Sequence, residues 1–262
     1  MTTLIKLGGS LITDKRRAKS FRRTTVQDIA RQLLELRTLQ PDRLIVLGHG
    51  SGSFGHYEAR KYNTISGLHS AEDRMGFARV GAVASELDGL ILKELLAVGL
   101  PALRFQPSAM QIARDQALVH LDVRPLILAL EKQFLPLVYG DVTLDETLGG
   151  TIISTESLFA RLVEPLQVKN IILLGSVDGA LDQDDQIIPH ITADNFRRFE
   201  HLLGESDGYD VTGGMQQKVR EMLDLVQFHQ DLNVFIANGN YSNILYDLLV
   251  AGAEAGTRIS AK

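Results

Sequence analysis

Residues 48–56 read Gly-His-Gly-Ser-Gly-Ser-Phe-Gly-His, and the rest of the chain is organised around them. Four glycines within the first eight of these residues let the backbone take left-handed or crowded conformations. Successive backbone N–H groups can then point toward one anion. An aliphatic run at residues 44–47 predicts a strand that leads into the loop, and open α/β sheets bind their ligands at such strand ends. We therefore predict a phosphate-binding loop, with a glycine-rich surface turn as the alternative.

Two common phosphate loops do not fit this stretch. Gly50, Gly52 and Gly55 match the spacing of the dinucleotide fingerprint. That fingerprint opens the first βαβ unit and is followed by an acidic residue at the end of the next strand, about 20 residues on. Here the loop follows the second predicted strand, and the predicted strand at residues 102–105 supplies no acid. The loop is not a Walker A loop either, because His56 stands where the lysine would be.

Composition narrows the class of protein. With 262 residues, 45% of them hydrophobic, and no low-complexity linker or internal repeat, we predict a single domain over residues 1–262. A net charge of −5 argues against a general nucleic-acid surface and leaves room for a local cationic pocket. The absence of cysteine excludes disulfides and fits a cytoplasmic enzyme. We expect no signal peptide and no membrane span, since no apolar run is long enough.

Predicted strands and helices alternate along the chain. The predicted strands are residues 4–7, 43–47, 102–105, 135–139, 171–174, 234–237 and 256–259. The predicted helices are residues 71–98, capped by Ser70, and residues 121–133, together with one that starts at a cap at Thr24 or Thr25 and ends at residue 37. Two more helices are predicted, one ending near residue 161 and one that contains Lys218. Residues 57–68 have no clear period and are predicted to form a loop. This alternation predicts a three-layer αβα sandwich with a mainly parallel central sheet. The small-residue loops should collect along one edge of that sheet.

Lys6 interrupts the apolar pattern of the first strand. Burying its ammonium group without a partner would be costly, so we expect the side chain to face an anion. A lysine on an edge strand that reaches solvent is the alternative. Lys15 follows within one short loop and could reach the same anion.

Six motifs, in order, resemble the amino acid kinase superfamily over nearly the whole chain. They are Lys6-Leu7-Gly8-Gly9-Ser10, Thr13-Asp14-Lys15, the loop from Gly50 to His56, Tyr139-Gly140-Asp141-Val142, Ser176-Val177-Asp178-Gly179, and the segment from Asp210 through Gly213 to Lys218. Residues 52–56 and 210–218 look most like the isopentenyl phosphate kinases of that superfamily. The resemblance implies transfer of the ATP γ-phosphoryl group to isopentenyl phosphate, with Mg²⁺ accompanying ATP and a homodimer as the assembly.

The residues make chemical sense of this reaction. The acceptor is itself a phosphate, already largely anionic near neutral pH because its second pKa is about 6. No strong general base is needed. The difficulty is that two anions must meet, so the protein must supply positive charge and positioning.

The resemblance also implies roles for individual residues. Lys6 and Lys218 would hold the ATP phosphates, and Lys15 would stabilise the transferring group. His56 would donate a hydrogen bond to the acceptor phosphate. The further ATP contacts implied are Gly8, Gly9, Ser10, Gly52, Asp178, Gly179 and Gly213, and the further acceptor contacts are Ser51, Gly55, Gly140 and Asp141. Residues 1–165, roughly, would bind the acceptor and residues 166–262 the nucleotide.

The chain departs from the family pattern at two places. Relatives usually carry three glycines where this chain has Gly50-Ser51-Gly52, and many place an aspartate where Glu156 stands. Either Glu156 or Asp141 would orient the two ATP lysines, and the alternative for Glu156 is a first-turn acid that complements the helix dipole. Phe54, Phe77, Val80 and Val83 are candidates for a pocket around the substrate tail, with simple core packing as the alternative.

Three other functions fit parts of the pattern. A kinase for another small phosphate or phosphonate, such as the fosfomycin kinases, resembles the same glycine loop and histidine. A non-catalytic nucleotide sensor often carries an appended regulatory domain, and the chain ends too soon after Arg258 to hold one. A dinucleotide-binding oxidoreductase would need an acid after the next strand, and the predicted strand at residues 102–105 supplies none.

Overall fold

The computed structural model describes residues 1–14, 16–62, 67–201 and 214–262. Its centre is an eight-stranded sheet in the order β10-β12-β11-β9-β1-β2-β6-β3. All neighbouring strands are parallel except β11 and β12, so the prediction of a mainly parallel sheet is confirmed. The strands are β1 (Thr2–Leu7), β2 (Leu44–His49), β3 (Ala102–Arg104), β6 (Leu135–Tyr139), β9 (Val168–Gly175), β10 (His190–Ile191), β11 (Asn233–Asn238) and β12 (Thr257–Ile259).

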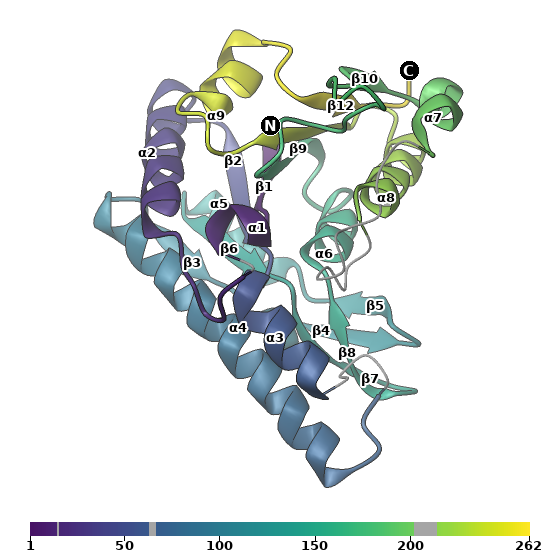
Figure 1. Ribbon diagram of the computed structural model, residues 1–262. Helices are drawn as coiled ribbons and strands as arrows, with labels where there is room; N and C mark the ends of the chain where they lie inside the picture. The colour runs from purple at the N-terminus through teal and green to yellow at the C-terminus, as the bar shows by residue number, and fades with distance from the viewer. Residues whose placement is uncertain (15, 63–66, 202–213) are drawn as a thin grey trace.

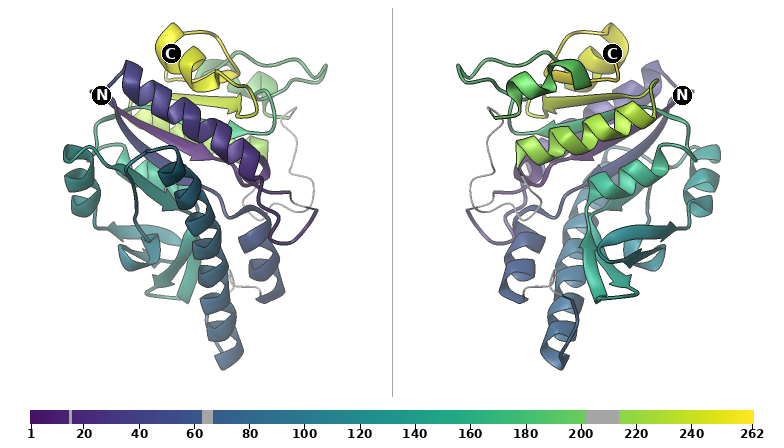
Figure 2. Two further views of the ribbon diagram at one scale, coloured as in Figure 1. Left: turned by 90° about the vertical axis from the view of Figure 1, so that its left-hand side faces the viewer. Right: turned by 90° about the vertical axis from the view of Figure 1, so that its right-hand side faces the viewer.

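Helices cover both faces of this sheet (Figure 1). Figure 2 shows α2 lying across the sheet in one view and α8 in the opposite view. A hydrophobic core lies on each face of the sheet, and alternate residues of β1 point into one or the other. Ile5 and Leu7 pack with one layer of helices, and Leu4 packs with the other. Each such side chain stabilises the fold by about 1.5–3 kcal/mol. One layer contains α1 (Gly9–Ile12), α2 (Arg23–Leu39), α4 (Ala71–Ala97) and α9 (Ile244–Tyr246), and the other α5 (Arg124–Glu131), α6 (Thr155–Leu162) and α8 (Met215–Phe228).

A second sheet of four strands, in the order β5-β4-β7-β8, was not predicted. The Asp145 carboxylate joins the turns of its two hairpins, because it accepts hydrogen bonds from backbone N–H groups of Gln116 and Thr147. The helix predicted from residue 121 begins only at Arg124, since Leu121 belongs to β5. The strands are β4 (Gln111–Arg114), β5 (Ala117–Leu121), β7 (Asp141–Asp145) and β8 (Gly149–Ile153).

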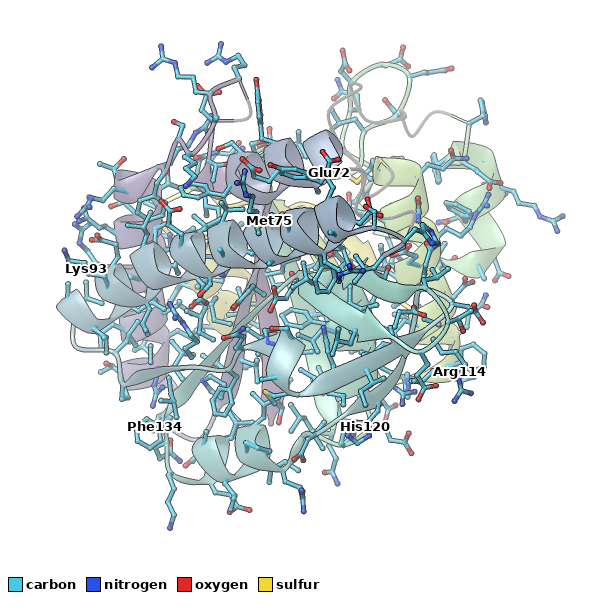
Figure 3. The ribbon with its side chains drawn as sticks, turned by 90° about the horizontal axis from the view of Figure 1, so that it is seen from below. Glu72, Met75, Lys93, Arg114, His120 and Phe134 are labelled. Atoms are coloured by element: carbon cyan, nitrogen blue, oxygen red, sulfur yellow. The ribbon has the colours of Figure 1, made fainter. Side chains whose placement is uncertain are left out.

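The long helix α4 begins at a capping box, in which the Ser70 side chain accepts from the Asp73 N–H and the Asp73 side chain accepts from the Ser70 N–H. This start and the end near Gly99 confirm the prediction. In Figure 3, Glu72 and Met75 mark the beginning of α4, and Lys93 lies near its other end. Helix α3 (Gly52–Tyr62) packs along α4.

Two further boundaries differ from the predictions because tertiary contacts decide them. Residues 57–62 were expected in a loop and instead continue α3, since Tyr62 packs against Gly76 of α4. Helix α2 starts at Arg23, ahead of the predicted cap at Thr24 or Thr25. The chain entering it is fixed by the hydrogen bond from the Arg22 N–H to the Ile12 carbonyl and needs no hydroxyl cap.

The remaining elements are short. They comprise the helix α7 (Ala193–Phe199), a 3₁₀ turn at Pro107–Ala109 and a π-helical turn at Asp247–Ala251. Within the described ranges, no helix combines the length and apolar character needed to cross a lipid bilayer.

Candidate active site

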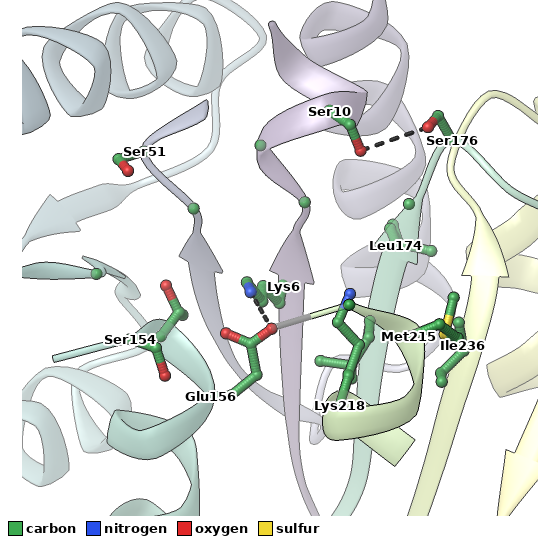
Figure 4. A pocket seen from close by; sticks show the side chains of 18 of the residues that line it. Lys6, Ser10, Ser51, Ser154, Glu156, Leu174, Ser176, Met215, Lys218 and Ile236 are labelled. Carbon is green, nitrogen blue, oxygen red and sulfur yellow. Dashed lines mark hydrogen bonds and ion pairs between the residues drawn. The ribbon is translucent and has the colours of Figure 1, made fainter. Parts of the chain in front are cut away.

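A cavity of about 220 Å³ opens where β1, β2, β6 and β9 end (Figure 4). The small-residue loops therefore collect along one edge of the sheet, as predicted from the sequence. The cavity lining includes eight of the residues singled out by the sequence: Lys6, Gly8, Gly9, Ser10, Ser51, Gly140, Glu156 and Lys218.

Lys6 of β1 and Lys218 of α8 both border this cavity, and the Glu156 carboxylate lies beside Lys6 (Figure 4). Glu156 lies in the first turn of α6, which Ser154 caps by accepting from the Ser157 N–H. Its carboxylate forms an ion pair with Lys6, and these two side chains are only 9% and 13% exposed. Burial pushes the pKa of Glu156 upward, but the charges of Lys6 and Lys218 outweigh it and hold that pKa below its usual value. The carboxylate is therefore ionised and fixes the Lys6 ammonium at the cavity.

Asp141, the other acid considered for this position, is engaged elsewhere. Its carboxylate accepts hydrogen bonds from the backbone N–H groups of Ser108, at 3.2 Å, and Val142, at 2.9 Å. Burial raises the pKa of Asp141 in spite of these hydrogen bonds. Among the described ion pairs of the cavity lysines, the acid is Glu156. Asp141 does not line the cavity, whereas the preceding residue, Gly140, does.

Gly9, which lines the cavity, and Gly52, just beyond it, are packed backbone against backbone. A Cβ atom on Gly9 would lie 2.6 Å from the Cα of Gly52. Gly52 has φ of +48°, and a Cβ atom there would lie 2.3 Å from the Thr13 hydroxyl. That hydroxyl donates to the Gly9 carbonyl and accepts from the Ser53 N–H, which ties the two loops together. Only glycine allows the ends of β1 and β2 to approach this closely.

The glycine loop is shorter than the sequence indicated. Gly48 and His49 belong to β2, where His49 pairs with Leu7 of β1, and α3 already begins at Gly52. Gly55 is therefore helical and packs against Ser51 rather than lining the cavity. The side chain of His56, together with Lys15 and Gly213, lies outside the part of the chain that the structure describes.

A second hollow adjoins the cavity on the side of β9 and β11. Ser176 and Val177 border both, and the Ser176 hydroxyl donates to the Ser10 hydroxyl at 3.4 Å (Figure 4). Asp178 lines the hollow and accepts hydrogen bonds from Asn238 and Tyr241, each at 2.8 Å, which lower its pKa. Asn238 and Tyr241 were not predicted as site residues, although the run Asn238-Gly239-Asn240 follows a predicted strand.

Gly179 does not line the hollow, because it packs against Thr257 of β12. The four candidates for a pocket around the substrate tail fall into two separate hydrophobic clusters. Phe54 and Val83 are buried in the main core and do not border the cavity. Phe77 and Val80 form a small cluster with Ala59, Val142 and Ile152, of which Ile152 borders the cavity.

The donor groups of the cavity suit an anion. Two ammonium groups and glycine backbone flank it, the arrangement by which proteins bind phosphates. Within the described ranges, no cluster of three or more His, Cys, Asp or Glu side chains could hold a metal ion.

These features define an α/β protein with a glycine-lined, lysine-flanked anion pocket at the carboxyl edge of its parallel strands. A family model described as the amino acid kinase family matches residues 1–238. The chain belongs to the amino acid kinase family, and the resemblance noted in its motifs is confirmed.

Similar proteins carry a more specific description. An isopentenyl phosphate kinase of Methanothermobacter thermautotrophicus is 32% identical, with 99% of each chain covered. An isopentenyl phosphate kinase of Methanocaldococcus jannaschii is 29% identical over 99% of this chain and 98% of the relative. A solved structure described as isopentenyl phosphate kinase superposes with a TM-score of 0.82 at 29% identity, covering 99% of this chain and all of the other.

Proposed function

We propose that this protein transfers the γ-phosphoryl group of ATP to isopentenyl phosphate, giving isopentenyl diphosphate. The observation that carries the proposal is the convergence of Lys6 and Lys218 on one glycine-lined cavity. Full-length similarity to isopentenyl phosphate kinases supports the choice of acceptor. Two polyanions must be brought into line for this reaction, and fixed positive charge is what the protein must contribute.

The proposed roles on the ATP side combine the family resemblance with the residues that line the cavity and the hollow beside it. Lys6 and Lys218 bind the ATP phosphates, and Glu156 fixes the Lys6 ammonium. The backbone of Gly8, Gly9 and Gly52, with the Ser10 hydroxyl, surrounds the same phosphates. Asp178 and the hollow beside it receive the nucleoside, with Gly213 near the adenosine.

On the acceptor side, Ser51 and Gly140 flank the phosphate, with Gly55 and Asp141 supporting their positions from behind. His56 donates a hydrogen bond to the acceptor phosphate, and Lys15 stabilises the group in transfer. The small cluster of Phe77 and Val80, next to Ile152, faces the apolar tail. Residues 1–165, roughly, thus bind the acceptor and part of the ATP phosphates, and residues 166–262 bind the rest of the nucleotide.

Mg²⁺ enters this proposal as a companion of ATP. Bound to the phosphates and completed by water, the ion neutralises part of their charge without needing a protein cage. The cavity fits this arrangement, since Glu156, the carboxylate among its described lining residues, is already held by Lys6.

We further propose that the enzyme acts in the cytoplasm as a homodimer. The cysteine-free sequence fits the first point. Exposed apolar side chains support the second: Leu103 lies on the edge strand β3, Leu128 lies on α5, and Phe134 lies just before β6. Phe134 lies at the periphery of the fold in Figure 3. Light scattering of the purified protein would give the mass that decides this.

A steady-state comparison of acceptors tests the proposed function. With ATP held constant, turnover should be much faster with isopentenyl phosphate than with a small phosphonate such as fosfomycin. His56→Ala should raise KM for the phosphate acceptor more than KM for ATP, because a donor to that phosphate is lost. His120→Ala, at an exposed position of β5, is the control (Figure 3). Equal rates with both acceptors would show the choice of substrate to be wrong.

A further inference from the structure

His49 is buried directly behind the catalytic cavity, and the reaction described above gives it no task. It is the last residue of β2 and is 0% exposed. Its ring stacks on Tyr139 of β6, with the ring centroids 5.3 Å apart and the planes 15° from parallel. A polar ring in such a place needs hydrogen-bond partners on its nitrogens.

Both ring nitrogens face oxygen atoms. Nδ1 lies 3.1 Å from the Gly50 carbonyl oxygen, and Nε2 lies 3.3 Å from a carboxylate oxygen of Asp88. Asp88 comes from α4, is itself fully buried, and forms an ion pair with Arg104 at the end of β3. A backbone carbonyl can only accept, so the contact to Gly50 is a hydrogen bond only when Nδ1 carries a proton.

The backbone of His49 is held as well. Its carbonyl oxygen accepts from the Thr155 hydroxyl at 2.7 Å and from the Gly140 N–H at 3.2 Å. Thr155 immediately precedes Glu156, which pairs with Lys6. His49 therefore contacts α4, β6 and α6, and both Gly140, just after β6, and Thr155 of α6 line the cavity.

Immediately after His49 comes the turn of Gly50 and Ser51, which lines the cavity before α3 begins at Gly52. Gly50 has little intrinsic conformational preference, so its peptide orientation must be set by its contacts. Its N–H donates to the Leu7 carbonyl at 3.0 Å, and its carbonyl faces His49.

We propose that His49 is a positioning residue for the reaction: its Nδ1–H donates to the Gly50 carbonyl and holds the Gly50–Ser51 turn in the orientation that receives the acceptor phosphate. Tyr139 stacks on the ring and limits its rotation, and Nε2 faces the Asp88 carboxylate. The kinetic part of this inference rests on the proposed function, whereas the hydrogen bond itself can be tested without any substrate.

The first test uses the unmodified protein. Long-range ¹H–¹⁵N NMR of protein labelled at histidine reports which ring nitrogens carry protons, and the His49 signals are identified by their loss in a His49 variant. We expect a proton on Nδ1. A His49 ring with an unprotonated Nδ1 overturns the proposal, whatever the protein phosphorylates.

The second test compares two amides that each replace one ring nitrogen. His49→Asn places a donor near the Nδ1 position, and His49→Gln extends its amide toward Asp88 instead. We expect KM for isopentenyl phosphate to rise about three- to tenfold in His49→Gln, the effect of one neutral hydrogen bond, and to stay closer to the wild-type value in His49→Asn. KM for ATP should change little in either.

Both variants lose the stacked ring, so a purely structural role for His49 would impair them alike. Equal acceptor KM values in the two, or a larger defect in His49→Asn, would overturn the proposal. If the wild-type protein itself fails to use isopentenyl phosphate, the proposed function fails, and the NMR result still decides the hydrogen bond.

Discussion

The carboxylate of Glu156, at the start of α6, forms a buried ion pair with the ammonium of Lys6 on β1. Lys218 of α8 borders the same cavity, and its charge also favours the ionised form of Glu156. One acid thus connects three elements that are far apart in the sequence. Its negative charge offsets part of the repulsion between the two ammonium groups that border this cavity.

Replacing the Glu156 carboxylate should have a larger effect on kcat than on the free energy of unfolding. In Glu156→Gln the Lys6 ammonium loses its fixed position, and a misplacement of about 1 Å can cost about 100-fold in rate. We expect kcat to fall about 10- to 100-fold. Glu164→Gln, an exposed position just beyond α6, should leave kcat unchanged. Steady-state assays of both proteins check this, and wild-type turnover in Glu156→Gln would contradict it.

The same ion pair predicts a pH dependence of stability. The folded-state pKa of Glu156 lies below its ordinary value of 4.5, so the unfolded chain takes up the proton first on acidification. The stabilisation is therefore complete above pH about 4.5 and is lost as the pH falls through the lower, folded-state pKa. Urea unfolding should give the wild type a higher free energy of unfolding than Glu156→Gln at pH 7, and this difference should shrink at acid pH. A difference that stays constant would argue against the assigned pKa direction.

Much of the fold could be predicted because the strands of the large sheet are buried on both faces. Such strands are continuous apolar runs, and residues 135–139 and 171–174 were found for this reason. The hairpins of the second sheet were missed because they are held by features that no local pattern displays. The carboxylate of Asp145 reaching across two turns is one such feature.

In the site, too, some residues could be predicted from a local sequence pattern, and others depend on tertiary contacts. Lys6 was recognisable because a charge inside a buried strand demands a partner, but the sequence left open whether Glu156 or Asp141 orients the lysines. The choice depends on register: Ser154 starts α6 where Glu156 points to Lys6, while Asp141 turns toward the Ser108 N–H. His49 was taken as part of a loop, since nothing nearby in sequence indicates Asp88 or Tyr139 as its neighbours.

Gly9 should tolerate no side chain, because the backbone of Gly52 occupies the space. A methyl group placed 2.6 Å from the Gly52 Cα must push the two loops apart. We expect Gly9→Ala to lower the free energy of unfolding by about 1–3 kcal/mol, the usual cost of overpacking. Gly175, another cavity glycine, is the control for thermal unfolding, since a Cβ atom there meets nothing closer than 3.9 Å. Equal melting temperatures for Gly9→Ala and Gly175→Ala would refute the predicted clash.

Lys218 should act on the nucleotide. Lys218→Met removes one ammonium from the cavity, and charge-assisted hydrogen bonds of this kind contribute about 1.5–3 kcal/mol, so KM for ATP should rise about tenfold or more. Lys169→Met is a matched control: its ammonium pairs with Asp231 at 3.0 Å on the surface, and exposed pairs contribute little. Kinetics at varied ATP concentrations separate the two. A rise in KM shared by both variants would point to net charge rather than to the cavity.

Ser51 and Gly55 should be energetically coupled. A Cβ atom on Gly55 would lie 2.4 Å from the Ser51 Cβ, so Gly55→Ala should destabilise the protein by about 1–3 kcal/mol. In the Ser51→Gly background that obstacle is gone. Gly55 lies inside α3, where alanine is favoured over glycine by about 0.5–1 kcal/mol, so the same substitution should become stabilising. Urea unfolding of the wild type, both single variants and the double variant measures the interaction free energy directly. Additive effects would mean that the helix relaxes around Ser51, and that the serine does not explain why glycine is required at position 55.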